Sequence, residues 1–94
     1  MRKIKMKPAQ KLHGTDAARM KRALRHARVA DDTKQALKRA IARRDLRTAT
    51  FDDLCRLGNA LAAEEKRTEK ATQRKGFGRT RVRLNAMLDR RIVR

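Results

Sequence analysis

The stretch "TFDDLCRLGNALAA", residues 50–63, decides the fold class of this chain. Thr50 is followed three residues later by Asp53, which is the spacing of a capping box, and the acids here would lie at the positive end of a helix. The apolar side chains recur every three or four residues, the period of a helix with one buried face. They are Phe51, Leu54, Leu57 and Leu61. We therefore predict a helix near residues 51–74 that forms the internal scaffold of the protein.

Three other segments carry the same helical period. Residues 16–30 follow Thr15, which can cap a helix, and they hold one stripe of alanine, methionine and leucine. Residues 33–45 begin beside an Asp-Gln pair with capping-box spacing, and residues 80–93 carry leucines and an isoleucine near one side after Thr80. We therefore predict an all-α protein, a small bundle of three to four helices.

The N-terminal segment, residues 1–14, differs in composition from the rest of the chain. It holds several cations, Pro8 and Gly14, but no acid and no sustained apolar period. Such a segment buries too little apolar surface to fold alone, and it is typical of basic tails that become ordered on phosphates. We expect a flexible basic arm at residues 1–14, followed by a helical domain at residues 15–94.

The net charge limits the classes of partner. The 94-residue chain has 28 Lys and Arg residues against 10 Asp and Glu residues, a net charge of +18. A compact domain with this charge repels itself, so a bound polyanion such as nucleic acid would stabilise it. The single cysteine cannot form an internal disulfide and favours a reducing compartment, so we expect a cytoplasmic protein. No apolar run long enough for a membrane helix is present, and we expect no membrane contact.

Catalytic, metal and cofactor sites have little support in the sequence. His13 and His26 fall on different predicted segments, and one cysteine does not complete a metal-ligand set. The paired acids at residues 52–53 and 64–65 would point to different sides of a helix, which suits dipole and solvent contacts better than acid–base chemistry. We therefore expect a protein that is not an enzyme and has neither a metal nor a cofactor.

The charge is distributed unevenly along the chain. Residues 1–50 hold 16 cations against 4 acids, and residues 73–94 hold 8 cations against 1 acid. Residues 51–72, in contrast, hold 4 cations against 5 acids. This pattern indicates that both ends of the chain face the partner while a charge-balanced helix holds them apart.

The second and third predicted helices raise the alternative of a helix-turn-helix reader of DNA. In that motif the N-terminal residues of the second helix enter the major groove. Here those residues would be Phe51, Asp52 and Asp53. Two adjacent carboxylates facing a polyanion disfavour this arrangement, so we favour phosphate contacts over base-specific recognition.

The stretch "QRKGFGRTRVR", residues 73–83, combines two glycines, one phenylalanine and five cations. Glycine after a long helix commonly ends it, so we expect a hinge with a C-cap at Gly76 and a new helix that starts at Thr80. The same hinge would let main-chain N–H groups and the positive end of the new helix approach a phosphate. Phe77 is the candidate for stacking on an unpaired base.

Together these features predict a small basic protein that binds the phosphate backbone of duplex DNA or structured RNA. Such a protein would organise or package DNA, regulate transcription, or belong to a ribonucleoprotein. The expected contacts come from the arm, the first two helices and the segment after the third helix. They are Lys3, Lys5, Lys7, Lys11, Lys21, Arg22, Arg25, Arg28, Lys38, Arg39, Arg43, Arg74, Lys75, Arg79, Arg81, Arg83 and Arg90.

The alternative function is that of an interaction factor, phage-encoded for example, that binds an acidic surface of a polymerase, a nuclease or another host protein. After Ala63 the sequence "EEKRTEKATQRK" has high helix propensity but no apolar face. We expect a solvated extension of the third helix there. A protein partner or a second copy of the chain would bind through the 51–74 helix.

Overall fold

The computed structural model describes residues 12–92, and these residues form four α-helices and a short 3-10 helix, with no β-strand among them. The α-helices are α1 (Gly14–Arg25), α2 (Asp31–Ala42), α3 (Phe51–Arg67) and α4 (Ala71–Ile92). The 3-10 helix η1 (Leu46–Thr48) lies between α2 and α3. The predicted all-α bundle is confirmed.

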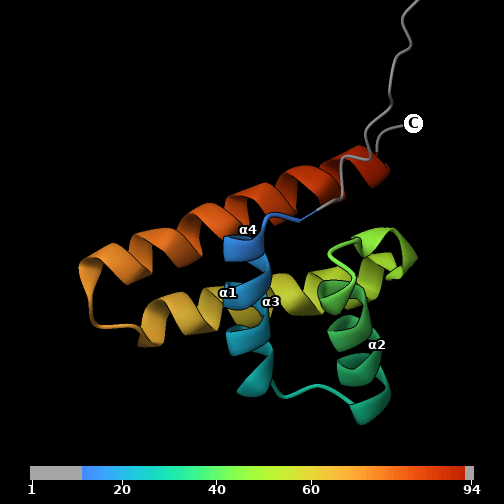
Figure 1. The fold of residues 1–94 in the computed structure, drawn as a ribbon, viewed down its shortest axis with the longest axis horizontal. Helices are drawn as coiled ribbons and strands as arrows, with labels where there is room; N and C mark the ends of the chain where they lie inside the picture. Colours follow the sequence, from blue (N-terminus) through green and yellow to red (C-terminus); the bar gives the residue numbers. More distant parts are fainter. Residues whose placement is uncertain (1–11, 93–94) are drawn as a thin grey trace, which may run out of the picture.

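The helices form two pairs that cross each other. Helices α3 and α4 run antiparallel and side by side, and α1 crosses them with α2 beside it (Figure 1). Helix α3 packs against each of the other three helices.

The core is built from the predicted stripes. Leu54, Leu57 and Leu61 of α3 are completely buried, and they pack with buried leucines of the other helices. Burying side chains of this size contributes about 1.5–3 kcal/mol each. Phe51, which we expected to face inward, is 40% exposed, because the first turn of α3 places it beside the stripe rather than on it.

The break between the last two helices lies earlier than predicted. The sequence pattern put the end of one helix near residue 74 and the start of the next near residue 80, whereas α3 ends at Arg67 and α4 begins at Ala71. Side chains close the end of α3, since Thr68 Oγ1 donates to the Glu64 carbonyl at 2.7 Å and Arg74 Nη1 donates to the Thr68 carbonyl at 3.2 Å. The glycine-rich stretch is therefore continuous helix, and the predicted hinge at Gly76 is wrong.

Gly76 serves close packing inside α4. A Cβ atom at this position would lie 2.6 Å from Nη2 of Arg19, which belongs to α1. Only glycine leaves room for a guanidinium directly against the helix backbone. Sequence alone does not distinguish this use of glycine from a helix cap, because both depend on the missing Cβ.

A pair of variants distinguishes the two uses of Gly76. In an Arg19→Ala background, Gly76→Ala is expected to raise the free energy of unfolding by about 1 kcal/mol, because alanine is the better residue inside a helix. Urea denaturation of Arg19→Ala with and without the second substitution measures this gain. A loss of stability instead would mean that Gly76 ends a helix in a conformation that alanine avoids.

The folded domain begins earlier than residue 15. Leu12 is 6% exposed, and its main-chain N–H donates to the Arg44 carbonyl at 2.9 Å. Gly14 is already the first residue of α1. Residues 12–14 therefore belong to the domain rather than to the predicted arm, because one leucine and one backbone hydrogen bond attach them to the bundle. The rest of the predicted arm lies outside the described residues.

Candidate nucleic-acid interface

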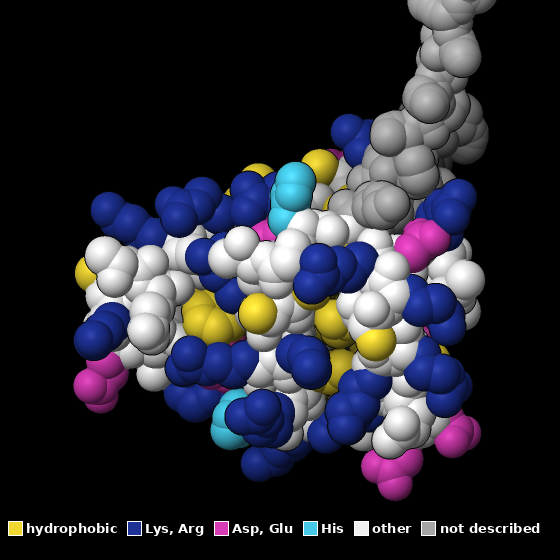
Figure 2. Space-filling model, in the orientation of Figure 1, with side chains coloured by type: hydrophobic (Ala, Val, Ile, Leu, Met, Phe, Trp, Pro, Cys, Tyr) yellow, Lys and Arg dark blue, Asp and Glu magenta, His cyan; other side chains and the backbone are white. Residues whose placement is uncertain are grey.

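The first group of exposed cations lies on the outer side of α1 and α2. Lys21 and Arg25 of α1 and Lys38 and Arg39 of α2 are exposed, on the sides of these helices away from their buried stripes. Helices α1 and α2 pack against each other, and we call these four exposed side chains together the α1–α2 face. In the region over α1 and α2, Lys and Arg side chains are numerous, and acidic side chains lie mainly at the margins of the view (Figure 2).

The second group lies along α4. Lys75, Arg79 and Arg90 are exposed, and we call these three side chains the α4 face. Lys and Arg side chains follow the first half of α4 in the same view (Figure 2). Among residues 12–92, no carboxylate lies within ion-pair distance of the cations that define the two faces.

A buried carboxylate joins α1 to α4. Asp16 is 2% exposed; it accepts a hydrogen bond from Thr80 Oγ1 at 2.7 Å and two from the guanidinium of Arg83 at 2.8 and 2.9 Å. Arg19 lies 3.8 Å from the same carboxylate and donates to Thr80 Oγ1 at 3.2 Å. Burial by itself raises the pKa of Asp16, but the hydrogen bonds from Arg83 and Thr80 and the charges of Arg83 and Arg19 outweigh it, so the pKa is lowered. Asp16 is therefore an ionised group of the core rather than a helix-dipole residue.

Two glutamates make the equivalent connection for α3. Glu64 is 3% exposed and accepts from Arg67 Nη2 at 2.7 Å and from Arg22 Nε at 3.0 Å, and Glu65 accepts from Arg81 Nε at 2.9 Å. Burial alone would raise the pKa of Glu64, but the two arginines lower it below its usual value. The predicted helical extension is wrong, because α3 ends at Arg67 and Glu64 and Glu65 bind Arg22 and Arg81 of other helices. Residues 69–75 are nevertheless exposed, as expected.

These ion pairs divide the predicted contact residues. Arg22 and Arg83 each bind a buried carboxylate and Arg81 binds the partly buried Glu65, while the three arginines remain 46%, 46% and 34% exposed. Their charge is largely compensated, so they attract a polyanion less than a cation without a carboxylate partner does. Arg43 and Arg74 donate instead to neutral oxygens, those of Thr48 and Thr68 respectively. Lys3, Lys5, Lys7 and Lys11 lie outside the described residues.

Phe77 is not available for stacking in this structure. Its side chain is 2% exposed, and the Arg22 guanidinium lies over the ring at 5.2 Å from the ring centroid. The continuous helix through residues 71–92 places Phe77 on the buried stripe, together with Thr80, which is fully buried. The predicted phosphate cradle is also wrong, because α4 has no helix start at Thr80 and so does not present a free helix N-terminus there.

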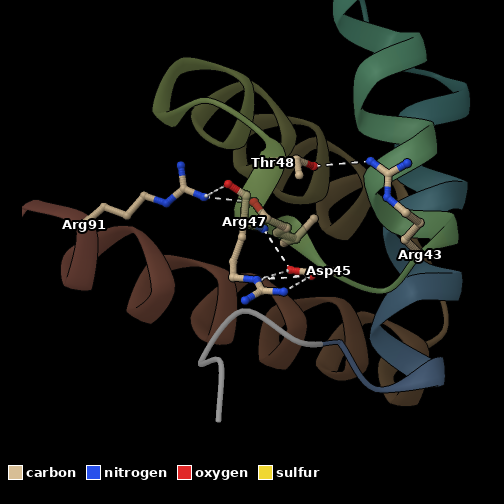
Figure 3. Close-up of polar contacts among 6 residues, drawn as sticks. Arg43, Asp45, Arg47, Thr48 and Arg91 are labelled. Atoms are coloured by element: carbon tan, nitrogen blue, oxygen red, sulfur yellow. Dashed lines mark hydrogen bonds and ion pairs between the residues drawn. The ribbon is translucent and has the colours of Figure 1, made fainter. Parts of the chain in front are cut away.

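Arginine side chains also fix the segment between α2 and α3 (Figure 3). Arg91 of α4 donates to the carbonyl oxygens of Leu46 and Ala49 at 2.8 and 2.7 Å, and Arg47 binds Asp45 at 2.6 Å. Arg91 thereby attaches the end of α4 to η1. The sequence offered no signal for this contact, because its acceptors are main-chain oxygens.

The structure also brings together residues that the sequence did not single out. His26, Arg56, Asn59 and Arg67 line one cleft with Arg28, between the end of α1 and the outer side of α3. Of these five residues, only Arg28 was predicted to contact the partner. Arg56, Asn59 and Arg67 lie in the predicted 51–74 helix, which we expected to be the internal scaffold. In the same described part of the chain, no group of three or more His, Cys, Asp or Glu side chains is placed to hold a metal ion.

Comparisons with models of protein families, with curated proteins and with solved structures found no match to this chain. None of the helices within residues 12–92 has the length and apolar character that crossing a membrane requires.

Proposed function

We propose that this protein is a non-enzymatic factor that binds the phosphate backbone of duplex DNA or structured RNA through the α1–α2 face together with the α4 face. The observation that carries the proposal is the division of its cations into two sets. Six arginines compensate four carboxylates of the domain, whereas Lys21, Arg25, Lys38 and Arg39 have no carboxylate partner among residues 12–92.

The free-energy cost of binding a phosphate differs between the two sets of cations. An arginine already held by a buried carboxylate would have to give up that contact to bind phosphate, and its charge is compensated at short range. An exposed cation without such a partner carries its full charge to the surface and releases counterions from nucleic acid when it binds. The α1–α2 face consists of cations of this second kind.

The scarcity of aromatic residues favours duplex DNA or structured RNA over single strands. Single-strand readers stack successive bases on exposed aromatic rings, and of the two phenylalanines Phe77 is buried, which leaves Phe51 as the one exposed ring. Phosphate contacts from Lys and Arg carry no sequence information by themselves. The proposed role is therefore DNA organisation or packaging, regulation of transcription, or assembly into a ribonucleoprotein, with a location on the nucleoid or in that particle.

A matched pair of lysine variants tests the proposal. Lys21→Gln with Lys38→Gln removes two charges from the α1–α2 face, and Lys66→Gln with Lys70→Gln removes two exposed charges elsewhere. The first variant is expected to bind a short duplex more weakly and to reduce the slope of log affinity against log salt by about two, one per lost phosphate contact. The second variant is expected to keep the slope of the wild type.

The control decides between a localised contact and net charge. Equal losses from the two double variants would mean that only total charge matters, and the assignment to the α1–α2 face would fail. If the wild-type chain does not bind DNA or RNA even at low salt, the proposed function itself fails.

A protein partner with an acidic surface is the second candidate. Phe51 and Val82 are the large apolar side chains that the described residues expose, at 40% and 61%. Such side chains suit a protein interface better than a phosphate backbone. Purification from the host with and without nuclease separates the candidates, because a protein that stays attached after complete digestion favours the second.

A further inference from the structure

The connector between α1 and α2 and the adjacent side of α3 enclose a cleft of about 340 Å³. Its polar lining consists of His26, Arg28, Arg56, Asn59 and Arg67, and small apolar side chains form the rest. The connector supplies His26 and Arg28 and helix α3 supplies the other three. The cleft therefore exists only because the end of α1 packs across α3.

Three arginines give this cleft a positive charge. No carboxylate is among its lining residues. Arg67 binds Glu64 through Nη2 at 2.7 Å but remains 51% exposed. For Arg28 and Arg56, no carboxylate among residues 12–92 lies within ion-pair distance. Two uncompensated guanidinium groups thus share a concave surface with an imidazole and an amide.

A second cleft in the domain lacks this property. The cleft lined by Arg19, Arg22 and Phe77 also holds two guanidinium groups. However, Arg19 forms an ion pair with Asp16 and a hydrogen bond with Thr80, and Arg22 binds Glu64. An anion entering there would compete with existing carboxylates, whereas an anion entering the cleft at Arg56 would not.

We propose that the cleft between the α1–α2 connector and α3 binds a phosphate group. Guanidinium groups match the geometry of phosphate oxygens, and a concave surface with one sign of charge concentrates the field of its cations. The volume exceeds that of a phosphate alone and leaves space for an attached sugar against the alanine and valine side chains. The phosphate comes either from the backbone of a polymer, in which case the site rests on the proposed function, or from a phosphomonoester such as a strand end or a free nucleotide.

Titration with inorganic phosphate tests the site without any nucleic acid. At constant ionic strength set with sodium chloride, added phosphate is expected to shift the NMR signals of His26 and Asn59 in the wild-type protein. The Arg28→Gln, Arg56→Gln double variant is expected to bind phosphate at least about tenfold more weakly, because it loses charge-assisted hydrogen bonds. The Lys66→Gln, Lys70→Gln variant removes two exposed charges outside the cleft and outside both cationic faces, and it is expected to titrate like the wild type.

Duplexes of one sequence, with and without a 5′ phosphate, distinguish the two sources. If the polymer backbone occupies the cleft, the Arg28→Gln, Arg56→Gln variant loses affinity for both duplexes. If a phosphomonoester occupies it, the wild type prefers the phosphorylated duplex or binds adenosine monophosphate, and only this variant loses the preference. Arg28 and Arg56 are exposed, so both variants should fold, which thermal melts followed by circular dichroism verify.

The outcomes keep this inference separate from the proposed function. Phosphate binding at His26 and Asn59 without any duplex binding would support the cleft and remove the proposed function. Duplex binding that depends on Lys21 and Lys38, together with phosphate signals that do not move, would keep the proposed function and overturn the cleft. The cleft is also overturned if the two double variants behave alike with every probe.

Discussion

Raising the salt concentration from about 50 to 200 mM is expected to weaken binding of duplex DNA by about 10³–10⁵-fold, the loss for a protein that contacts about six to ten phosphates. Binding of each phosphate by Lys or Arg releases counterions from the duplex, and added salt opposes that release. The α1–α2 face supplies four uncompensated cations and the α4 face supplies three more. Both faces must therefore engage the nucleic acid to reach the expected range.

The slope of log affinity against log salt measures how many faces are used. If the α1–α2 face binds alone, its four cations give a slope near −4 and a loss of only about 100-fold over the same interval. Fluorescence anisotropy of a labelled duplex at several salt concentrations provides the slope. A slope near zero would contradict phosphate binding altogether, and a slope well beyond that for seven contacts would require cations outside both faces, such as those of residues 1–11.

Replacing Asp16 by Asn is expected to lower the free energy of unfolding by about 3 kcal/mol at neutral pH, the low end of the range for breaking a buried ion pair. The substitution leaves the guanidinium groups of Arg19 and Arg83 close together without their shared carboxylate. The low end applies because Arg83 is 46% exposed, so water partly compensates its charge. Urea denaturation of the wild type and the variant measures the difference.

The pH dependence of this difference identifies its cause. The pKa of Asp16 is lowered in the folded protein, where burial is outweighed by Arg83, Thr80 and Arg19, and in the unfolded chain it is about 3.9. The stabilisation from the carboxylate is therefore fully present above a pH of about 4 and is lost as the pH falls through the lower, folded-state pKa. In strong acid the free energy of unfolding of the wild type should approach that of the Asp16→Asn variant, because a protonated carboxyl group is uncharged, as asparagine is.

The matched control is Asp32→Asn. Asp32 is an exposed residue in the first turn of α2, where its contribution comes from the helix dipole. The expected loss there is about 0.3–1 kcal/mol. Equal losses from the two variants, or a loss at Asp16 that persists in strong acid, would contradict an internal ion-pair network.

The regular part of this fold could be predicted because it depends on local repetition. The three- and four-residue spacing of Leu54, Leu57 and Leu61 identified both a helix and its buried face. The capping hydrogen bond from the main-chain N–H of Asp53 to Thr50 Oγ1, at 3.0 Å, confirms the predicted start of α3. Helix ends were less predictable, because Gly76 fits both a helix cap and a site of close packing.

The candidate site was only partly predictable from the sequence. The exposure of Lys21, Arg25, Lys38 and Arg39 follows from their positions opposite the apolar stripes, which the helical period gives directly. The ion pairs of Asp16 with Arg83 and of Glu64 with Arg22 could not be predicted from the sequence, since the partners are separated by 67 and 42 positions along the chain. The sequence does not distinguish a cation that pairs with a carboxylate from one that has no such partner.

The sequence by itself determined the all-helical bundle, the net charge of +18 and the buried stripes, because helical period and charge are properties of neighbouring residues. Only the tertiary structure decided which cations keep an uncompensated charge, where the last two helices separate, and that Arg28 and Arg56 share a cleft. The reason is that helix crossing sets the distances between residues remote in the chain, and ion pairs require separations of a few ångströms. Opposite charges that the sequence places far apart thus cancel in the core, and the remaining cations form the surface proposed to bind phosphate.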